Sequence, residues 1–345
     1  MDCLEDKRTS AVDICTLLQN TSRTVESAME SILEESLRDQ PELCAEARDS
    51  IKDAGLRMLS TLFRVSYEIS GRPFEQVLPV CAGIELLQVS ALLIDDIFDD
   101  APFRNGRSSF ASRRGTKEGM ALGIVLAALG MKTMAACLGH HARYKQACLI
   151  LELFEQVQQD IYKGQILDLH HSGRTDFSEN QYFDMIGKTT ASFIRAPLVA
   201  GALCWDAPAE TLTLLDSVGF NLGLAYQVRD DVVDVLGDSI CTGKPQFGDL
   251  RQRRMRLPVI HALKNSTPDK SEWLRCLLVG TEAMSDCEIE RVRALLFQTG
   301  SLEYAMEKTR RHCETATASL HGLQIEHEEF HNRMRAIANL ISSFE

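Results

Sequence analysis

The sequence predicts an all-α protein in which long helices surround a central cavity, and three observations predict this fold. Apolar residues recur at helical spacing along most of the 345 residues, as in Val25, Met29, Ile32, Leu33 and Leu37. Proline is sparse, with 9 residues, and it stands at the edges of segments, where helices begin or end. Few alternating patterns, which would indicate strands, compete with the helical period.

Individual helices can be placed by their ends. An apolar run over 77–94 predicts a buried helix that ends in acidic residues, and polar residues interrupt it too often for a membrane span. Ser178 followed by Gln181 forms the pattern of a capping box, which starts a second helix. Asp206, just ahead of a proline, is the expected N-cap of a long helix that runs toward Val235.

Loop signals cluster at 101–109, 170–178, 237–256 and 265–270. None of these loops is long enough, or low enough in complexity, to be a linker between domains. We therefore expect a single domain over residues 1–345, because long core helices around a cavity can hold a chain of this length together.

Composition narrows the classes of partner and compartment. With 37 Lys and Arg against 49 Asp and Glu, the formal net charge of −12 argues against a nucleic-acid binder or a binder of anionic membranes. The 11 cysteines form no Cys-x-x-Cys pair, which suits a reducing compartment better than a disulfide framework. No targeting segment is visible near Met1, so we expect a cytoplasmic protein.

The strongest local signal is an acidic cluster, Asp95-Asp96-Ile97-Phe98-Asp99-Asp100, at the end of the apolar helix. If that helix continues, Asp95 and Asp99 lie one turn apart on one face, with Cβ atoms roughly 5–6 Å apart. Carboxylates this close repel each other, so they take up a proton or bind cations. A solvated acidic helix end is the alternative for a single cluster of this kind.

A second cluster makes that alternative weaker. Asp230, Asp231 and Asp234 repeat the same i, i+1, i+4 spacing at the end of another apolar helix. Two such faces across a helical cavity would hold Mg2+, which typically uses one or two carboxylates together with phosphates of the substrate. The pair of clusters therefore predicts a diphosphate substrate.

These residues resemble the trans-isoprenyl diphosphate synthases, the polyprenyl synthetase family, in motifs that run from about 55 to 260. The remaining residues, 261–345, would form C-terminal helices. Besides the two clusters, the likeness is carried by Gly164-Gln-Ile-Leu-Asp-Leu169, Gly187-Lys-Thr-Thr190, Tyr226-Gln227, Gly243-Lys-Pro245, Gly248-Asp-Leu250 and Leu257-Pro-Val-Ile260. The resemblance implies the isoprenoid-synthase fold, usually a homodimer, and three Mg2+ ions that hold an allylic prenyl diphosphate.

The resemblance also implies roles for single residues. The implied metal site consists of Asp95, Asp96, Asp99, Asp230, Asp231 and Asp234, in which Asp231 orients other ligands. The implied diphosphate and catalytic residues are Arg104, Lys188, Thr189, Gln227, Lys244 and Arg254. The implied pocket residues are Gln88, Ser90, Ala91, Gln165 and Asp168, with Asp168 orienting Lys188. Because Ser90 and Ala91 are small, we expect room for a chain of fifteen or twenty carbons.

The sequence departs from the family where a second substrate, isopentenyl diphosphate, would bind. The usual lysine, arginine and proline of that segment are replaced by Leu56, Leu59 and Ser60, and a second arginine after the first cluster is replaced by Asn105. Each lost charge-assisted contact is worth about 1.5–3 kcal/mol, so three lost cations would remove several powers of ten of affinity. Four neighbouring arginines could compensate, namely Arg57, Arg107, Arg113 and Arg114.

This deficit leads us to expect a terpene-synthase-like enzyme, a class I carbon–oxygen lyase. It would ionise an allylic diphosphate such as farnesyl or geranylgeranyl diphosphate and then cyclise the cation, eliminate a proton or capture water. One alternative is a chain-elongating prenyltransferase of the geranylgeranyl diphosphate synthase type with a rebuilt second subsite. Others are an enzyme that joins two allylic diphosphates or prenylates another acceptor, and a subunit that modulates a prenyl synthase.

Overall fold

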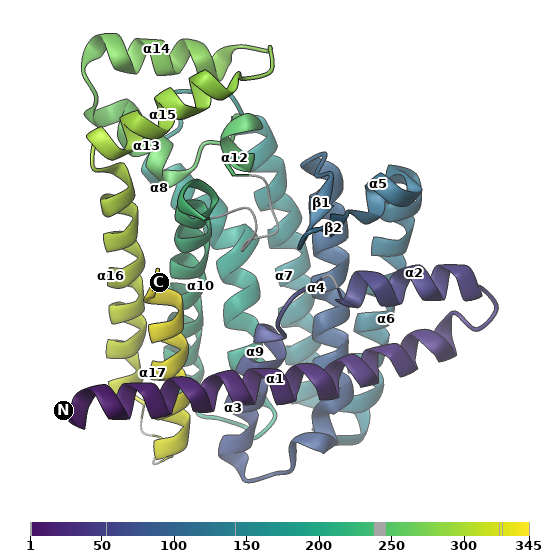
Figure 1. Ribbon diagram of the computed structural model, residues 1–345. Coiled ribbons are helices and arrows are strands. Elements are labelled where there is room, and N and C mark those ends of the chain that lie inside the picture. Colours follow the sequence, from purple (N-terminus) through teal and green to yellow (C-terminus); the bar gives the residue numbers. More distant parts are fainter. Residues whose placement is uncertain are drawn as a thin grey trace.

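The computed structural model describes residues 2–52, 54–141, 143–237, 246–323, 325 and 327–344, and the side chains of 2–13 and 141 are left out. The described chain is almost wholly helical, as predicted, apart from one short hairpin (Figure 1). Its α-helices are α1 Asp2–Ser36, α2 Pro41–Lys52, α3 Met58–Tyr67, α4 Leu78–Phe98, α5 Phe110–Arg114, α6 Thr116–His141, α7 Tyr144–His171, α8 Glu179–Ile186, α9 Ser192–Leu203, α10 Ala209–Leu236, α12 Gly248–Arg251, α13 Leu257–Asn265, α14 Pro268–Val279, α15 Asp286–Gln298, α16 Ser301–His321 and α17 Glu328–Ser342.

Long helices run side by side, and their directions determine where the site lies. In Figure 1, α4, α6, α7, α10 and α16 are roughly aligned, and α1 crosses them near one end. The C-terminal ends of α4, α7 and α10 lie at the opposite end, close to α12 and to the hairpin of β1 (Phe103–Arg104) and β2 (Arg107–Ser108). Both aspartate clusters are therefore brought to the same end of the bundle.

The apolar helix α4 lies against α6 at very short range. A Cβ atom added to Gly83 would come within 2.7 Å of the backbone oxygen of Gly130, and one on Gly130 would come within 2.6 Å of the oxygen of Gly83. Only glycine on both helices permits this approach. The close contact fixes the axial position of α4 and, with it, the acidic residues at its end.

Two segments, Phe74–Phe98 and Thr116–His140, are long and apolar enough to cross a membrane by length and composition alone. The apolar window of the first is 72% buried inside the molecule, as predicted for a core helix. The window of the second is 39% buried, and Met120 and Ile124 on α6 are exposed. A helix of the protein interior passes the same test of length and composition, so this is weak support for a span.

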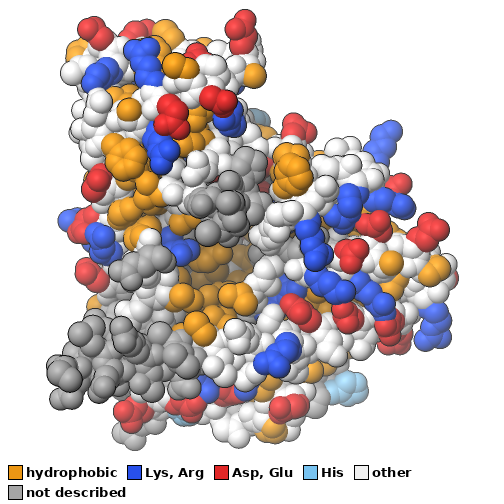
Figure 2. All heavy atoms as spheres, in the orientation of Figure 1, with side chains coloured by type: hydrophobic (Ala, Val, Ile, Leu, Met, Phe, Trp, Pro, Cys, Tyr) orange, Lys and Arg blue, Asp and Glu red, His pale blue; other side chains and the backbone are white. Residues whose placement is uncertain are grey.

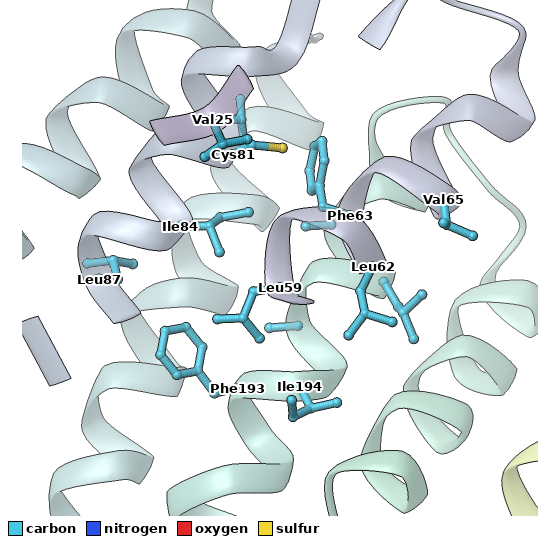
Figure 3. Close-up of a cluster of buried hydrophobic side chains, with 14 of the residues drawn as sticks. Val25, Leu59, Leu62, Phe63, Val65, Cys81, Ile84, Leu87, Phe193 and Ile194 are labelled. Atoms are coloured by element: carbon cyan, nitrogen blue, oxygen red, sulfur yellow. The ribbon is translucent and has the colours of Figure 1, made fainter. Parts of the chain in front are cut away.

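The core consists of two clusters of buried apolar side chains, and α10 contributes to both. Figure 3 shows part of the larger cluster, where Leu59 of α3 lies with Ile84 of α4 and with Phe193 and Ile194 of α9. Leu59 is 5% exposed, so burial of its apolar side chain stabilises the bundle at this point.

One predicted helix start is confirmed and another is wrong. Ser178 caps α8 in a capping box with Gln181. Asp206, in contrast, is not the N-cap of α10, because the chain turns there with φ +61° and Pro208 occupies the N-cap position. The Asp206 carboxylate instead accepts hydrogen bonds from Arg143 at 3.0 Å and Gln146 at 2.6 Å, which tie this turn to the start of α7.

Candidate active site

The first aspartate cluster closes the C-terminal end of α4. Asp99 is the C-cap residue, and its backbone N–H donates to the Asp95 carbonyl at 2.9 Å, so the two side chains are one turn apart as predicted. Asp96 is 4% exposed and accepts a hydrogen bond from Arg104 Nε at 2.9 Å. Arg104 Nη2 lies 3.3 Å from Asp95 Oδ2. Arg104 is therefore held against the cluster by two of its carboxylates.

Arg254 connects this cluster to helix α7. Its guanidinium forms an ion pair with Asp99, and its Nη1 lies 2.9 Å from Asp168 Oδ2. Arg254 is only 3% exposed, and Gln252 supports the same arrangement by donating from Nε2 to the Asp99 carbonyl at 2.5 Å. A buried cation thus stands between the two helix ends, at a position that the sequence had implied for diphosphate binding.

The second cluster at the end of α10 divides into buried and accessible acids. Asp231 is 2% exposed, and it accepts hydrogen bonds from the Tyr182 hydroxyl at 2.6 Å and from Gln227 Nε2 at 3.0 Å. Asp234 Oδ1 accepts from the backbone N–H of Gly248 at 3.0 Å. Asp230 is exposed. Two donors therefore hold the Asp231 carboxylate, and its implied role in orienting other ligands stays a prediction.

Crowding changes the acidity of these carboxyl groups. Burial, with the adjacent Asp95, raises the pKa of Asp99 to about 7. Burial, with Asp249 and Asp230 nearby, raises the pKa of Asp234 to about 8. Burial also raises the pKa of Asp231 to about 7. Burial therefore makes the negative charge of these three carboxylates costly, and a bound cation would stabilise that charge.

Hard oxygen ligands whose negative charge is poorly solvated fit Mg2+. Among the described residues, no group of three or more His, Cys, Asp or Glu side chains converges as a complete metal site. Mg2+ commonly takes one or two carboxylates and completes its shell with water and phosphate oxygens. The residues present therefore fit ions that are held jointly by the protein and a diphosphate.

A π-helical turn, η3 (Gly187–Ala191), presents Lys188, Thr189 and Thr190. A Cβ atom on Gly164 of α7 would come within 2.6 Å of the Thr189 side chain, so this glycine lets the two segments touch. Thr190 donates to Gln227 Oε1 at 2.6 Å. Lys188 forms an ion pair with Asp184, not with Asp168 as the resemblance implied, because Asp168 pairs with two arginines instead. Turns of this kind are frequent at functional sites, and here one is linked to the second cluster through Gln227.

The structure places the predicted pocket residues in different surroundings. Ser90 is 1% exposed and donates to the Gly123 carbonyl of α6 at 2.7 Å, so its hydroxyl is directed toward α6. Gln88 and Ala91 are half-buried on α4, and Gln165 is buried on α7. Lys244 lies outside the described residues.

The segment expected to hold isopentenyl diphosphate contains no direct replacement for the missing lysine. Leu56 is 60% exposed, whereas Arg57 is fully buried and forms ion pairs with Glu26 at 3.0 Å and Glu85 at 3.9 Å. Arg57 also donates to the Ile51 carbonyl at 2.5 Å. The hypothesis that Arg57 compensates is therefore wrong, because its charge is used inside the protein.

The other neighbouring arginines differ from Arg57 in being close to the surface. Arg113 Nη2 lies 3.4 Å from Glu46, and Arg114 Nε lies 3.0 Å from Glu118. Arg107 is exposed on β2. These three side chains remain candidates for contact with a second anionic substrate.

Sequence reasoning missed three residues of the site. Tyr182 lies on α8 and contacts Asp231, while Asp249 and Arg256 form an ion pair at 3.0 Å beside the second cluster. The sequence offered a modest signal. Asp249 lies within the Gly248-Asp-Leu250 motif, and Arg256 comes two residues after Arg254 and directly before the Leu257-Pro258 pair. A buried tyrosine gives no such local signal.

The fold and the site together define an isoprenoid-synthase-type helical protein. The fold matches a polyprenyl synthase from Caulobacter crescentus, solved with calcium and isoprenyl diphosphate, at TM-score 0.86 and 22% identity over 96% of this chain and 97% of that one. It also matches a geranylgeranyl pyrophosphate synthetase from Pyrococcus horikoshii at TM-score 0.86 and 21% identity, over 96% and 98% of the two chains.

Sequence comparison assigns the family. Residues 40–296 match the polyprenyl synthetase model. The chain is 30% identical to a short chain isoprenyl diphosphate synthase of Methanothermobacter thermautotrophicus, over 85% of this chain and 88% of that protein. It is 31% identical to a geranylgeranyl diphosphate synthase of Mycobacterium tuberculosis, over 70% and 68% of the two chains. The chain belongs to the polyprenyl synthetase family.

Proposed function

We propose that this protein is a Mg2+-dependent prenyltransferase that elongates an allylic prenyl diphosphate with a five-carbon diphosphate unit. The observation that carries the proposal is the position of both aspartate clusters at the same end of the bundle (Figure 1). Arg254 connects Asp99 to Asp168, and Asp168 also pairs with Arg256, which lies 3.9 Å from Asp231. The similar proteins are named as isoprenyl and geranylgeranyl diphosphate synthases, which favours elongation over the cyclisation first expected. Carbon–oxygen lyase activity has no such support.

The chain's own residues suit such a reaction. Arg104 and Arg254 supply fixed cations beside the carboxylates, where negative charge accumulates as an allylic carbon–oxygen bond breaks. Mg2+, when bound, neutralises the departing diphosphate. Figure 2 shows hydrophobic side chains gathered in a hollow near the centre of one face, which would exclude water from a carbocation.

Ionisation without condensation is the second candidate, and a specific observation favours it. Leu56 is exposed where a cation is expected, Leu59 is buried in the core, and Arg57 is committed to internal ion pairs. These features weaken the grip on isopentenyl diphosphate. A terpene-synthase-like outcome would follow if the carbocation lost a proton or captured water before a second substrate arrived.

One assay separates the two candidates. Purified protein is incubated with Mg2+ and geranyl, farnesyl or geranylgeranyl diphosphate, with and without isopentenyl diphosphate, and products are identified by mass spectrometry. Longer diphosphates that need isopentenyl diphosphate support the proposal. Hydrocarbons or alcohols formed without it would overturn the proposal in favour of the lyase. No turnover of any allylic diphosphate would support a modulatory subunit.

We further propose that the protein is a cytoplasmic homodimer with one domain per chain. The exposed apolar side chains of α6, including Met120 and Ile124, support a surface that a second copy would cover. Cysteines in the described part of the chain are free thiols, which suits a reducing compartment. Light scattering after size-exclusion chromatography measures the mass, and replacing Ile124 with Lys should shift it toward the monomer.

A further inference from the structure

Arg256 lies among three carboxylates, and the sequence motifs did not indicate this arrangement. Its Nη1 and Nη2 donate to the two oxygens of Asp168 at 3.0 and 3.2 Å. Its Nη2 also donates to Asp249 Oδ1 at 3.0 Å, and its Nε lies 3.9 Å from Asp231 Oδ1. The Arg256 side chain is 13% exposed, so these contacts are largely shielded from water.

The acids near the second cluster therefore fall into two sets. Asp168, Asp231 and Asp249 surround Arg256, and Asp168 has Arg254 as an additional partner. Asp230 and Asp234 have no ion pair with any cation in the part of the chain that the structure describes. A divalent cation that approaches the first set would be repelled by arginine, whereas at Asp230 and Asp234 it would meet carboxylates without an ion pair in the described part of the chain.

Charge near the protein interior acts over several ångströms. A guanidinium placed among three carboxylates reduces the negative potential that attracts a divalent ion, because the interaction is weakly screened where water is excluded. The arginine also fixes the direction of Asp168 through a two-point contact, which a single ammonium could not do.

We propose that Arg256 is a positioning residue that serves as the built-in counter-ion of Asp168, Asp231 and Asp249. It leaves Asp230 and Asp234 as the carboxylates of the second cluster that meet a divalent ion. As a consequence, the free enzyme binds divalent ions more weakly than it would without this arginine. This inference rests on the proposed function for the identity of the site, but its test needs no turnover.

The test measures Mn2+ binding to the full chain without substrate, by calorimetry or electron paramagnetic resonance. Arg256→Gln should bind Mn2+ roughly tenfold more tightly, which corresponds to about 1.4 kcal/mol. The control is Arg251→Gln, since Arg251 contacts the exposed Asp286 and should leave Mn2+ affinity unchanged. A purely structural role for Arg256 predicts equal or weaker binding in the variant, and that result would overturn the inference.

A charge-matched double variant, Arg256→Gln with Asp249→Asn, removes one cation and one acid together. Its Mn2+ affinity should return to within about twofold of the unmodified protein, because the local charge balance is restored. If the single variant does not fold, this double variant decides alone. A loss of more than tenfold would overturn the inference, because it would mean that these residues bind the metal directly. An inactive enzyme with the predicted Mn2+ affinities would contradict the proposed function and leave this inference standing.

Discussion

The hydroxyl of Tyr182 donates a hydrogen bond to Asp231 at 2.6 Å, and both side chains are buried. Tyr182 lies on α8 and Asp231 on α10, so the contact joins helices that are separated by the π-helical turn and α9. The phenol satisfies one oxygen of the carboxylate, while Gln227 donates to the other. Asp231 is thereby held in one orientation beside the accessible acids.

Removing this hydroxyl should impair turnover more than folding. In Tyr182→Phe we expect kcat/KM for the allylic diphosphate to fall about tenfold, because losing a buried hydrogen bond to a charged group costs about 1.5 kcal/mol. Steady-state kinetics at saturating Mg2+ measures the change. Tyr304→Phe is the control, since Tyr304 bonds Glu179 away from the clusters. Equal losses in both variants would contradict a specific role for Tyr182.

The cluster acids implied as metal ligands should differ sharply from Asp100, the exposed last residue of the first cluster. Asp234→Asn should lower kcat at least 100-fold, because it removes one of the carboxylates that would hold Mg2+. Asp100→Asn is the matched control, with activity within about twofold, because Asp100 is exposed and its φ of +44° suits asparagine. Comparable losses in the two variants would contradict the assignment of Asp234.

Stability without metal should fall as pH rises through neutrality. The pKa values of Asp99 and Asp234 are raised to about 7 and about 8 in the folded protein, above those of the unfolded chain. Between pH 5 and 8 the folded state therefore holds more protons than the unfolded state, and the free energy of unfolding decreases with pH.

Melting temperatures measured in EDTA from about pH 5 to 8.5 check this expectation. Added Mg2+ with inorganic diphosphate should flatten the dependence, because bound cations replace the protons. A melting temperature that rises with pH in EDTA would contradict the raised pKa values of Asp99 and Asp234.

Restoring the missing cations should strengthen the second subsite. In the double variant Leu56→Lys with Asn105→Arg, both at exposed positions, we expect KM for isopentenyl diphosphate to fall at least tenfold. A charge-assisted contact is worth about 1.5–3 kcal/mol, and part of this is lost to the left-handed backbone at Asn105. Leu340→Lys, an exposed control on α17, should leave KM unchanged. An unaltered KM in the double variant would place the second diphosphate elsewhere.

Local spacing was sufficient to predict much of this molecule. The apolar helix with the first acidic cluster at its end and the capping box of Ser178 and Gln181 follow from contacts within one or two turns, which sequence separation alone determines. The prediction for Asp206 failed for two reasons. Its backbone adopts a left-handed turn, and its carboxylate accepts a hydrogen bond from Gln146 of α7, which is distant in sequence. The hydrogen bond of Ser90 was not predictable for a similar reason, since its partner on α6 is distant in sequence.

The sequence by itself determined the helices, the spacing of acids within each cluster and the family. Only the tertiary structure decided which charges meet. Arg57 is used inside the core, while Arg254 and Arg256 reach acids on α4, α7 and α10 that lie up to 155 residues away in the chain. Ion pairing depends on distance and burial, and both are properties of helix packing rather than of sequence separation.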